Sequence, residues 1–312
     1  MNQPISPDAL FERQIQYPDI LPRERLSRLV GLDGHKLRLS KMLGALINPA
    51  GIEGWAQRHH PGATGLTMSI LGRPPLVVLA GDVGSGKTEL AETIGDAVAR
   101  QEGISITLFP LSLSARGQGR VGEMTQLISA AFDQVVYEAS KLSNERGKAR
   151  GAVILLVDEA DALAQSREAA QMHHEDRAGV NAFIRGIDRL ANNRLPGAVI
   201  MCTNRLSALD PAVKRRAADI LSFERPSEAQ RHAVIQRSLG EVGLSSSDLD
   251  RLVRATGPSN AREYGFTFSD LTQRLIPAII LDAYPDKAIE ARRALEIVAM
   301  TLPTPPFKDI GS

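Results

Sequence analysis

The hydrophobic pattern divides the chain into two regions. Between residues 76 and 223, short apolar runs alternate with segments in which apolar residues recur every three or four positions. Runs that are apolar at every position are typical of strands buried on both faces, and their alternation with helices predicts a parallel sheet flanked by helices. The five predicted strands are 76–80, 104–109, 152–157, 198–203 and 220–223.

The remaining segments lack this alternation. Residues 1–28 contain four prolines, which predicts an N-terminal arm or linker with room for one short helix. A large α/β domain is predicted over 29–225. Beyond Pro226 the pattern is helical without a convincing strand, which predicts a small helical lid domain at 226–302 and a tail at 303–312. The helical segments of this lid are 229–239, 248–255, 268–281 and 288–300.

Composition narrows the class of protein. Lys and Arg number 37 against 36 Asp and Glu, so no overall field favours nucleic acid or an anionic membrane. Aromatic residues make up 4%, too few to predict a stacking platform for single strands. The single cysteine, Cys202, fits a reducing compartment, and neither a signal peptide nor an apolar run of about 18 residues is present. We therefore expect a cytoplasmic protein.

A glycine-rich motif follows the first predicted strand. The pattern Gly81-x-x-x-x-Gly86-Lys87-Thr88 lies between an apolar strand and a helix expected to begin at about Thr88. In such a loop, backbone N–H groups converge on phosphate oxygens, Lys87 reaches the β- and γ-phosphates, and Thr88 supplies a hydroxyl to Mg²⁺. The motif predicts ATP binding by Gly81, Asp82, Val83, Gly84, Ser85, Gly86, Lys87, Thr88 and Glu89.

Polar residues end two further strands. Asp158 and Glu159 follow the apolar run 153–157, and Asn204 follows 199–203. Carboxyl ends of parallel strands share one edge of a sheet, so these side chains are expected beside the phosphate loop. Asp158 suits Mg²⁺, Glu159 suits orienting or deprotonating the attacking water, and Asn204 suits holding that water or the γ-phosphate.

Two adjacent arginines precede the last predicted strand. Arg215 and Arg216 are compatible with a solvated basic helix end. Alternatively, one or both reach the γ-phosphate bound by a neighbouring subunit, because an arginine supplied in trans stabilises the charge that develops during hydrolysis. That alternative predicts a ring. The predicted catalytic set is then Lys87, Glu159, Asn204, Arg215 and Arg216.

Together these motifs resemble the AAA+ ATPases over roughly residues 29–300. Gly31 and Leu32, within Val30-Gly-Leu-Asp33, look like the adenine-side loop that precedes the family's core, which implies that they contact ATP. Within AAA+, the chain looks most like the pachytene checkpoint (thyroid-receptor-interactor) remodellers. The segments that carry this finer resemblance are 158–163, 177–190, 202–204 and 216–220.

The resemblance implies a specific activity. It implies a homohexamer that engages a HORMA-domain protein, threads that partner's N-terminal segment into a central pore and converts it from a closed to an open form. The short N-terminal region resembles the bacterial members, which implies negative regulation of antiphage CBASS-type signalling. The motifs also leave open a nucleic-acid motor, such as a clamp loader, helicase loader or transposition ATPase, and a nucleotide-dependent assembly scaffold.

The sequence departs from the family pattern at two places. The first pore loop is expected at Arg116, Gly117, Gln118, Gly119 and Arg120, where the family's aromatic paddle is missing; an ordinary surface loop is the alternative. Near the family's sensor 2 arginine the chain has Ser269 and Asp270. Arg262 or Arg274 is a possible substitute, although each is also compatible with a surface arginine.

Overall fold

The computed structural model describes residues 10–11, 13–113, 123–144, 148–163, 174–259 and 262–307. The chain forms two compact units. The sheet unit comprises 1–27, 34–80 and 88–222, and the lid unit comprises 28–33, 81–87 and 223–312. Two short segments that are distant in sequence, 28–33 and the phosphate loop 81–87, therefore belong to the lid unit.

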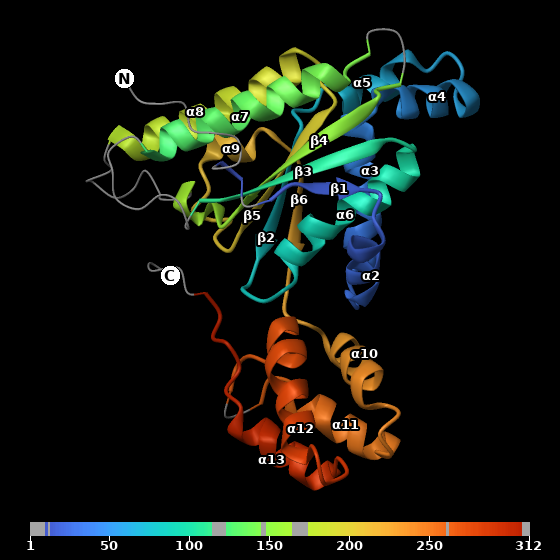
Figure 1. The fold of residues 1–312 in the computed structure, drawn as a ribbon, viewed down its shortest axis with the longest axis vertical. Coiled ribbons are helices and arrows are strands. Elements are labelled where there is room, and N and C mark those ends of the chain that lie inside the picture. Colours follow the sequence, from blue (N-terminus) through green and yellow to red (C-terminus); the bar gives the residue numbers. More distant parts are fainter. Residues whose placement is uncertain are drawn as a thin grey trace. The chain divides into compact units, whose positions relative to one another are not determined.

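The described strands form one six-stranded sheet in the order β1-β3-β4-β5-β2-β6 (Figure 1). The pairs β3–β4, β4–β5 and β2–β5 are parallel, as predicted, and β1 is antiparallel to β3. The strands are β1 Ile15–Tyr17, β2 Leu76–Gly81, β3 Ser105–Ser112, β4 Gly151–Asp158, β5 Gly197–Thr203 and β6 Ala217–Phe223.

The sequence predicted a sheet of five parallel strands, and the structure adds a sixth, the antiparallel strand β1. This strand has three residues, too few for a periodic pattern, and it lies within the region predicted as an arm. Tyr17 is its buried residue, and the Tyr17 hydroxyl donates to the backbone carbonyl of Glu92. Its strand conformation therefore depends on pairing with β3, a tertiary contact that the local sequence does not reveal.

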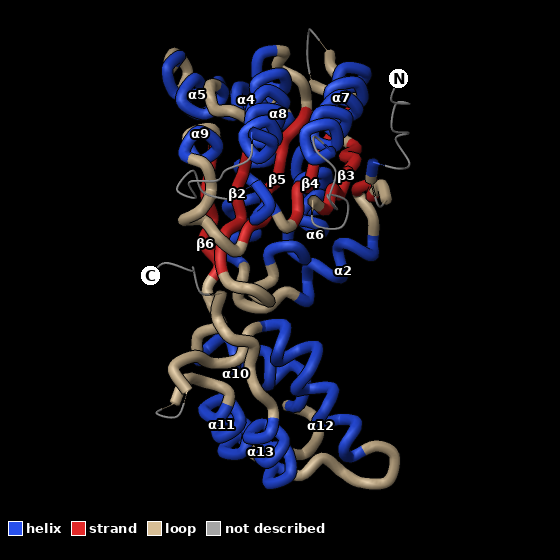
Figure 2. The backbone as a smooth tube through the Cα atoms, turned by 90° about the vertical axis from the view of Figure 1, so that its left-hand side faces the viewer, coloured by secondary structure: helices blue, strands red, loops and turns tan. Residues whose placement is uncertain are grey.

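Helices cover the sheet (Figure 2). Alternate residues of β2, β3, β4 and β5 form a buried apolar cluster with the inner faces of α7 and α8, which contains Phe132 and Phe183 with ring centroids 5.6 Å apart. The described helices of this unit are α2 Ile20–Arg28, α3 Asp33–Ile47, α4 Pro49–His59, α5 Thr64–Leu71, α6 Lys87–Glu102, α7 Glu123–Leu142, α8 His174–Asn192 and α9 Pro211–Lys214. A described 3₁₀ turn, η1, spans Ala160–Leu163. Some end residues of α2 and α3, and Lys87, fall in the lid unit.

The lid unit is helical within its described part. It contains α10 Glu228–Leu239, α11 Ser246–Ala255, the π-helical turn η2 Asp270–Leu275, α12 Ile276–Ala283 and α13 Ala291–Met300 around a core that includes Phe266. The pattern 268–281 predicted one helix, but Pro277 falls in the first turn of α12. Proline has no N–H to continue the preceding hydrogen-bond ladder, which explains why the helix changes type there. Among the described residues, no helix combines the length and apolar composition needed to cross a bilayer.

Candidate functional site

The phosphate loop has the backbone conformation that its glycines permit. β2 runs into the loop at Gly81, and α6 begins at Lys87, one residue before the predicted start. Gly84 has φ +70°, and a Cβ there would lie 2.8 Å from the Thr267 hydroxyl. Only glycine combines this positive φ with such close packing. The loop is therefore shaped by contacts with the lid as well as by its own sequence.

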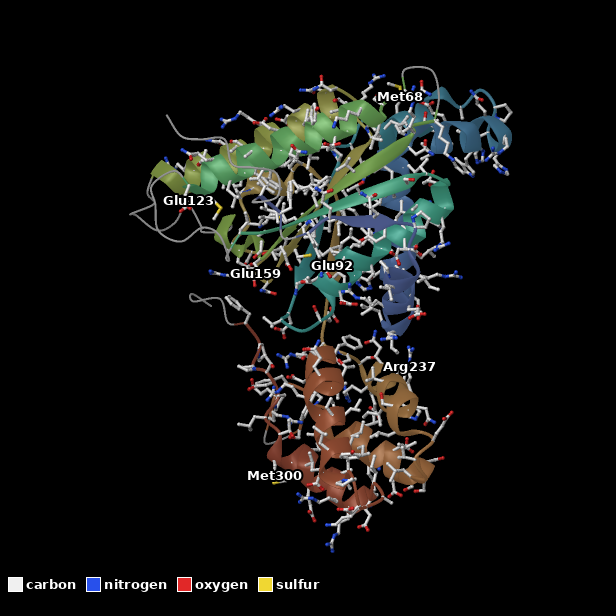
Figure 3. The ribbon with its side chains drawn as sticks, viewed as in Figure 1. Met68, Glu92, Glu123, Glu159, Arg237 and Met300 are labelled. Carbon is white, nitrogen blue, oxygen red and sulfur yellow. The ribbon has the colours of Figure 1, made fainter. Side chains whose placement is uncertain are left out.

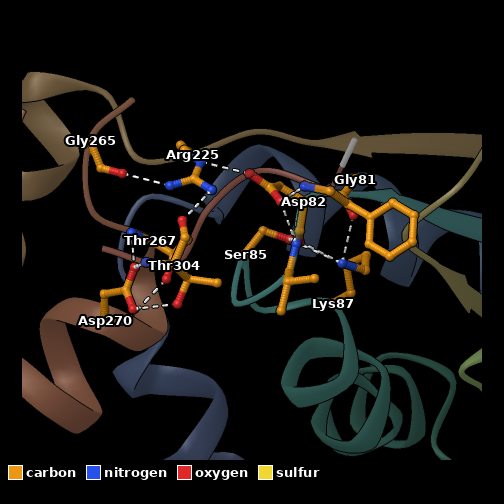
Figure 4. Close-up of polar contacts among 11 residues, drawn as sticks. Gly81, Asp82, Ser85, Lys87, Arg225, Gly265, Thr267, Asp270 and Thr304 are labelled. Atoms are coloured by element: carbon orange, nitrogen blue, oxygen red, sulfur yellow. Dashed lines mark hydrogen bonds and ion pairs between the residues drawn. The ribbon is translucent and has the colours of Figure 1, made fainter. Parts of the chain in front are cut away.

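Lys87 folds back over the start of the loop. Its ammonium donates to the backbone carbonyls of Gly81 at 2.9 Å and Asp82 at 2.7 Å, and its side chain is buried (Figure 4). The Ser85 hydroxyl also donates to the Asp82 carbonyl, at 2.7 Å. The two bonds of Lys87 hold its ammonium inside the phosphate loop. The sequence motif predicts that this ammonium binds the β- and γ-phosphates.

The predicted adenine-side residues lie beside the same loop. A Cβ on Gly86 would be 3.2 Å from Leu32 Cδ1, and Leu32 is buried. Gly31 has φ +74°, and its carbonyl accepts a hydrogen bond from the Gln230 amide at 2.7 Å. This bond ties the segment 28–33 to the lid helix α10, and Gln230 is a contributor that the sequence motifs did not indicate.

The first turn of α6 carries Thr88 and Glu89. Thr88 is exposed, so its hydroxyl is accessible. The Glu89 carboxylate accepts two hydrogen bonds from Arg25, at 2.8 Å from Nε and 2.7 Å from Nη2. These bonds raise the pKa of Arg25, and the guanidinium offsets a negative charge that would otherwise repel a triphosphate. Sequence reasoning missed Arg25 because it lies in the segment predicted as a linker.

The acidic end of β4 contains both predicted carboxylates. Asp158 is half-buried, and its Oδ1 accepts the Glu159 backbone N–H at 2.8 Å. Glu159 is exposed, lies at the end of the sheet where β4 leads into η1 (Figure 3), and has φ +51°, a strained value for a residue with a Cβ. Ser112, which is in register with Asp158, donates to Glu159 Oε2 at 3.3 Å. This serine was not predicted.

A third acid of this region, Asp161, holds the end of β5. Its Oδ1 accepts from the Thr203 hydroxyl at 2.5 Å and from the backbone N–H groups of Asn204 at 2.9 Å and Arg205 at 3.2 Å. Its Oδ2 accepts from Asn204 Nδ2 at 3.0 Å. The Asn204 amide nitrogen therefore points towards Asp161, and its oxygen lies on the opposite edge of the amide. We call Ser112, Asp158, Glu159, Asp161 and Asn204 the polar edge.

The paired arginines have different environments. Arg216 forms a two-pronged pair with Asp188 on α8, at 2.8 Å from Nε and 3.0 Å from Nη2, and the hydrogen bonds raise the pKa of Arg216. Arg215 is exposed at the C-terminal end of α9. Arg216 is therefore anchored to α8, whereas Arg215 lies exposed at the surface of the chain.

Arg262 and Arg274, the two possible substitutes for the sensor 2 arginine, both bind groups within the lid unit. Arg262 donates to the carbonyls of Ala255 at 3.0 Å and Gly257 at 2.8 Å, while Arg274 pairs with Asp270 at 2.8 Å. The predicted pore-loop residues Arg116, Gly117, Gln118, Gly119 and Arg120 lie outside the described residues.

The donors predicted for Mg²⁺ are of the right chemical kind. The Asp158 carboxylate and the Thr88 hydroxyl offer oxygen atoms only, which suits a hard cation that retains water and also binds substrate phosphates. Elsewhere in the part of the chain that the structure describes, no group of three or more His, Cys, Asp or Glu residues forms a metal cluster. The residues present thus fit magnesium bound together with a nucleotide.

Known proteins share both the sequence and the fold. The family model "ATPase family associated with various cellular activities (AAA)" matches residues 77–225. The CD-NTase-associated protein 6 of Escherichia coli (strain MS 115-1) is 67% identical over 309 residues, and the match covers 99% of each chain.

Two solved structures extend this similarity. A chain of the E. coli MS115-1 HORMA:CdnC:Trip13 complex has a TM-score of 0.89 at 65% identity, covering 97% of this chain and 99% of that chain. Trip13 from Rhizobiales has a TM-score of 0.75 at 58% identity, covering 95% of this chain and all of that chain. The predicted AAA+ fold class and the predicted resemblance are confirmed. The chain is an AAA ATPase and belongs to the family of CD-NTase-associated protein 6.

Proposed function

We propose that this ATPase is a ring-forming protein remodeller that converts a HORMA-domain partner from a closed to an open form and thereby restrains CBASS-type antiphage signalling in the cytoplasm. The observation that carries the proposal is the 67% identity to CD-NTase-associated protein 6 across 99% of both chains. The similarity to a chain of a HORMA:CdnC:Trip13 complex supports a HORMA-domain protein as the partner.

The chemistry proposed for this chain is in-line attack of water on the γ-phosphate of ATP. The loop amides and Lys87 bind the phosphates, and the Glu159 carboxylate accepts a proton from, or orients, the attacking water. Asn204 is the amide that holds that water or the γ-phosphate. Mg²⁺, held by Asp158 and Thr88, would supply neutralisation of the triphosphate charge.

Asp161 adds orientation to this mechanism. Its Oδ2 accepts a hydrogen bond from the Asn204 amide nitrogen at 3.0 Å, so the amide oxygen and the second amide hydrogen are directed elsewhere. We infer that this orientation presents an acceptor to the water and a donor to the γ-phosphate oxygens. A preorganised amide stabilises the transition state because no reorientation is required during the reaction.

The proposed ring completes the site from a neighbouring subunit. Arg215 is exposed, and a guanidinium from one subunit would stabilise the charge that develops on the γ-phosphate of the next. Arg216 contributes through its pair with Asp188, which orients the end of α9. Hydrolysis would then depend on assembly, as a homohexameric remodeller requires.

A substrate trap tests the proposal. Glu159→Gln keeps the size of the side chain but removes the carboxylate, so we expect it to bind ATP, remain assembled and retain the HORMA protein of the E. coli MS115-1 complex on an affinity column. Lys87→Ala, which lacks the phosphate contact, is the matched control and should retain none. Recovery of duplex DNA in place of the HORMA protein would contradict the proposal.

Threading can be tested with the same trap. If the ring pulls on the partner's N-terminal segment, removal of that segment should abolish both retention by Glu159→Gln and stimulation of the wild-type ATPase. Retention of the shortened partner at wild-type level would show that the ring engages a different surface.

A further inference from the structure

Arg225 connects the phosphate loop to two other parts of the lid unit. Its Nε donates to Asp82 Oδ2 at 2.6 Å, its Nη1 to the carbonyl of Gly265 at 2.6 Å, and its Nη2 to the carbonyl of Thr304 at 2.7 Å (Figure 4). The Arg225 side chain is 15% exposed and that of Asp82 is 16% exposed, so water screens this ion pair only weakly.

The Thr304 carbonyl belongs to a segment that is itself held in place. We call residues 303–307 the C-terminal strap. The Thr304 hydroxyl donates to Asp270 Oδ1 at 2.7 Å, and its backbone N–H donates to Asp270 Oδ2 at 3.0 Å. Pro303 is buried, and the Phe307 N–H reaches Asp82 Oδ1 at 3.4 Å. The strap thus contacts both the lid core and the phosphate loop.

Asp270 anchors this network inside the lid. The carboxylate is 1% exposed, and it also accepts the Thr267 N–H at 3.0 Å. Burial favours its neutral form, but the hydrogen bonds from Thr267 and Thr304 outweigh burial and lower the pKa of Asp270. A second connection to the loop runs from the Ser269 N–H to the Gly84 carbonyl at 3.1 Å.

We propose that Arg225 is a positioning residue for nucleotide binding and that the C-terminal strap holds Arg225 in its working geometry. Three charge-assisted hydrogen bonds fix the guanidinium, and the guanidinium fixes Asp82, the second residue of the phosphate loop. Asp82 in turn accepts the Val83 N–H on Oδ1 at 2.8 Å and donates its own N–H to the Phe223 carbonyl at 3.3 Å. The start of the loop is thereby held in the conformation from which its later amides reach phosphate. This inference deepens the proposed ATP site and rests on it.

Arg225 also neutralises the charge of the Asp82 carboxylate. Without its partner, the Asp82 carboxylate would stand unneutralised in a loop that binds a triphosphate, and like charges in a partly buried site repel strongly. Loss of Arg225 should therefore weaken ATP binding more than loss of both partners. This prediction distinguishes an electrostatic and positioning role from a general effect on lid folding.

The test measures ATP affinity and the steady-state KM and kcat of the full chain without any partner protein. We expect Arg225→Gln to raise the Kd and KM for ATP about tenfold or more, with a smaller change in kcat, because charge-assisted hydrogen bonds are lost at the binding step. Adding Asp82→Asn to Arg225→Gln should recover part of the affinity. Arg293→Gln, which breaks an exposed ion pair of the same lid with Asp282, is the matched control and should leave both constants unchanged.

Two milder variants keep the test decisive if Arg225→Gln does not fold. Arg225→Lys retains the charge but not the three-pronged geometry, and should give an intermediate KM. Thr304→Val removes the strap's hydroxyl bond to Asp270 and should raise KM about twofold to threefold, because a single neutral-donor bond is lost.

Opposite results would overturn the proposal. An unchanged KM for Arg225→Gln, or for Arg225→Lys where the glutamine variant does not fold, would show that the loop is positioned without this residue. No recovery of affinity in the double variant would show that Asp82 is not the group on which Arg225 acts. Failure of the wild-type chain to hydrolyse ATP would instead contradict the proposed function, so the two failures are distinguishable.

Discussion

The polar edge and the network of Asp82, Arg225, Thr267, Asp270 and Thr304 both use buried or half-buried carboxylates to organise neighbouring donors. The two differ in where those donors lie along the chain. Asp161 binds three consecutive residues, Thr203 to Arg205, at the end of one strand. Asp82 and Asp270 instead bring together Arg225, Thr267 and Thr304, which are far apart in the sequence. The edge is consequently set by the order of strands in the sheet, whereas the network depends on how the lid folds back on the loop.

The largest expected effect comes from a substitution confined to the polar edge. Glu159→Gln should lower kcat by about 10³–10⁴ while the KM for ATP changes little, because a general base acts in the transition state rather than in binding. Stopped-flow and steady-state phosphate release would measure both constants. Asp133→Asn, at an exposed ion pair on α7, is a matched carboxylate control. A loss of less than tenfold would remove Glu159 from the chemistry.

The second prediction asks whether the edge is completed by a neighbouring subunit. Arg215→Ala should lower the rate by about 10³, the usual effect of losing an arginine supplied in trans. Arg216→Ala should cost less activity, but should lower Tm by about 1–3 °C because its pair with Asp188 is worth about 0–1 kcal/mol at the surface.

Mixing experiments give this prediction a direct control. Arg215→Ala and Lys87→Ala subunits should each hydrolyse ATP far more slowly than the wild type, but a mixture should regain activity where an intact loop meets an intact Arg215. Absence of recovery in verified mixed rings would place Arg215 outside the neighbouring site.

A smaller effect is expected from Asp161, which accepts a hydrogen bond from the Asn204 amide nitrogen. Asp161→Asn should lower kcat about 10–100-fold, because its amide nitrogen would face the Asn204 amide nitrogen and the latter would rotate. The KM for ATP should stay close to the wild-type value. In an Asn204→Ala background, Asp161→Asn should add little, since Asp161 acts through Asn204. Fully additive losses in this double-mutant cycle would contradict that coupling.

The smallest expected effect concerns the stability of the lid below about pH 4. Because the pKa of Asp270 is lower in the folded protein than in the unfolded chain, its stabilising contribution is present above the unfolded value of about 3.9 and is lost as pH falls through the folded value. Thr304→Val removes one bond to the ionised carboxylate, so acid unfolding should begin at a higher pH. Circular dichroism melts between pH 2 and pH 7 would measure the shift, and an identical acid profile would contradict it.

The difference between strand-end residues and contacts distant in sequence also explains how much the sequence could predict. The glycine-rich motif combines residue spacing with a flanking strand and helix, so Lys87 was placed correctly where the loop meets α6. Asp158 and Asn204 were placed correctly at strand ends, and the fold class followed from alternating patterns. The sequence did not reveal β1 because three residues carry no period. It also did not reveal Ser112 or Arg225, because their relevance arises from register and from pairing across 143 residues.

The most direct test of the central claim is the effect of a HORMA-domain protein on ATP hydrolysis. The steady-state rate should be measured with the wild-type chain, with and without the HORMA protein of the E. coli MS115-1 complex, alongside disassembly of a preformed HORMA:CdnC complex. The account predicts that the HORMA protein stimulates hydrolysis and that disassembly requires ATP and fails with Glu159→Gln. An ATPase rate unaffected by the HORMA protein, with the HORMA:CdnC complex intact after ATP turnover, would contradict it.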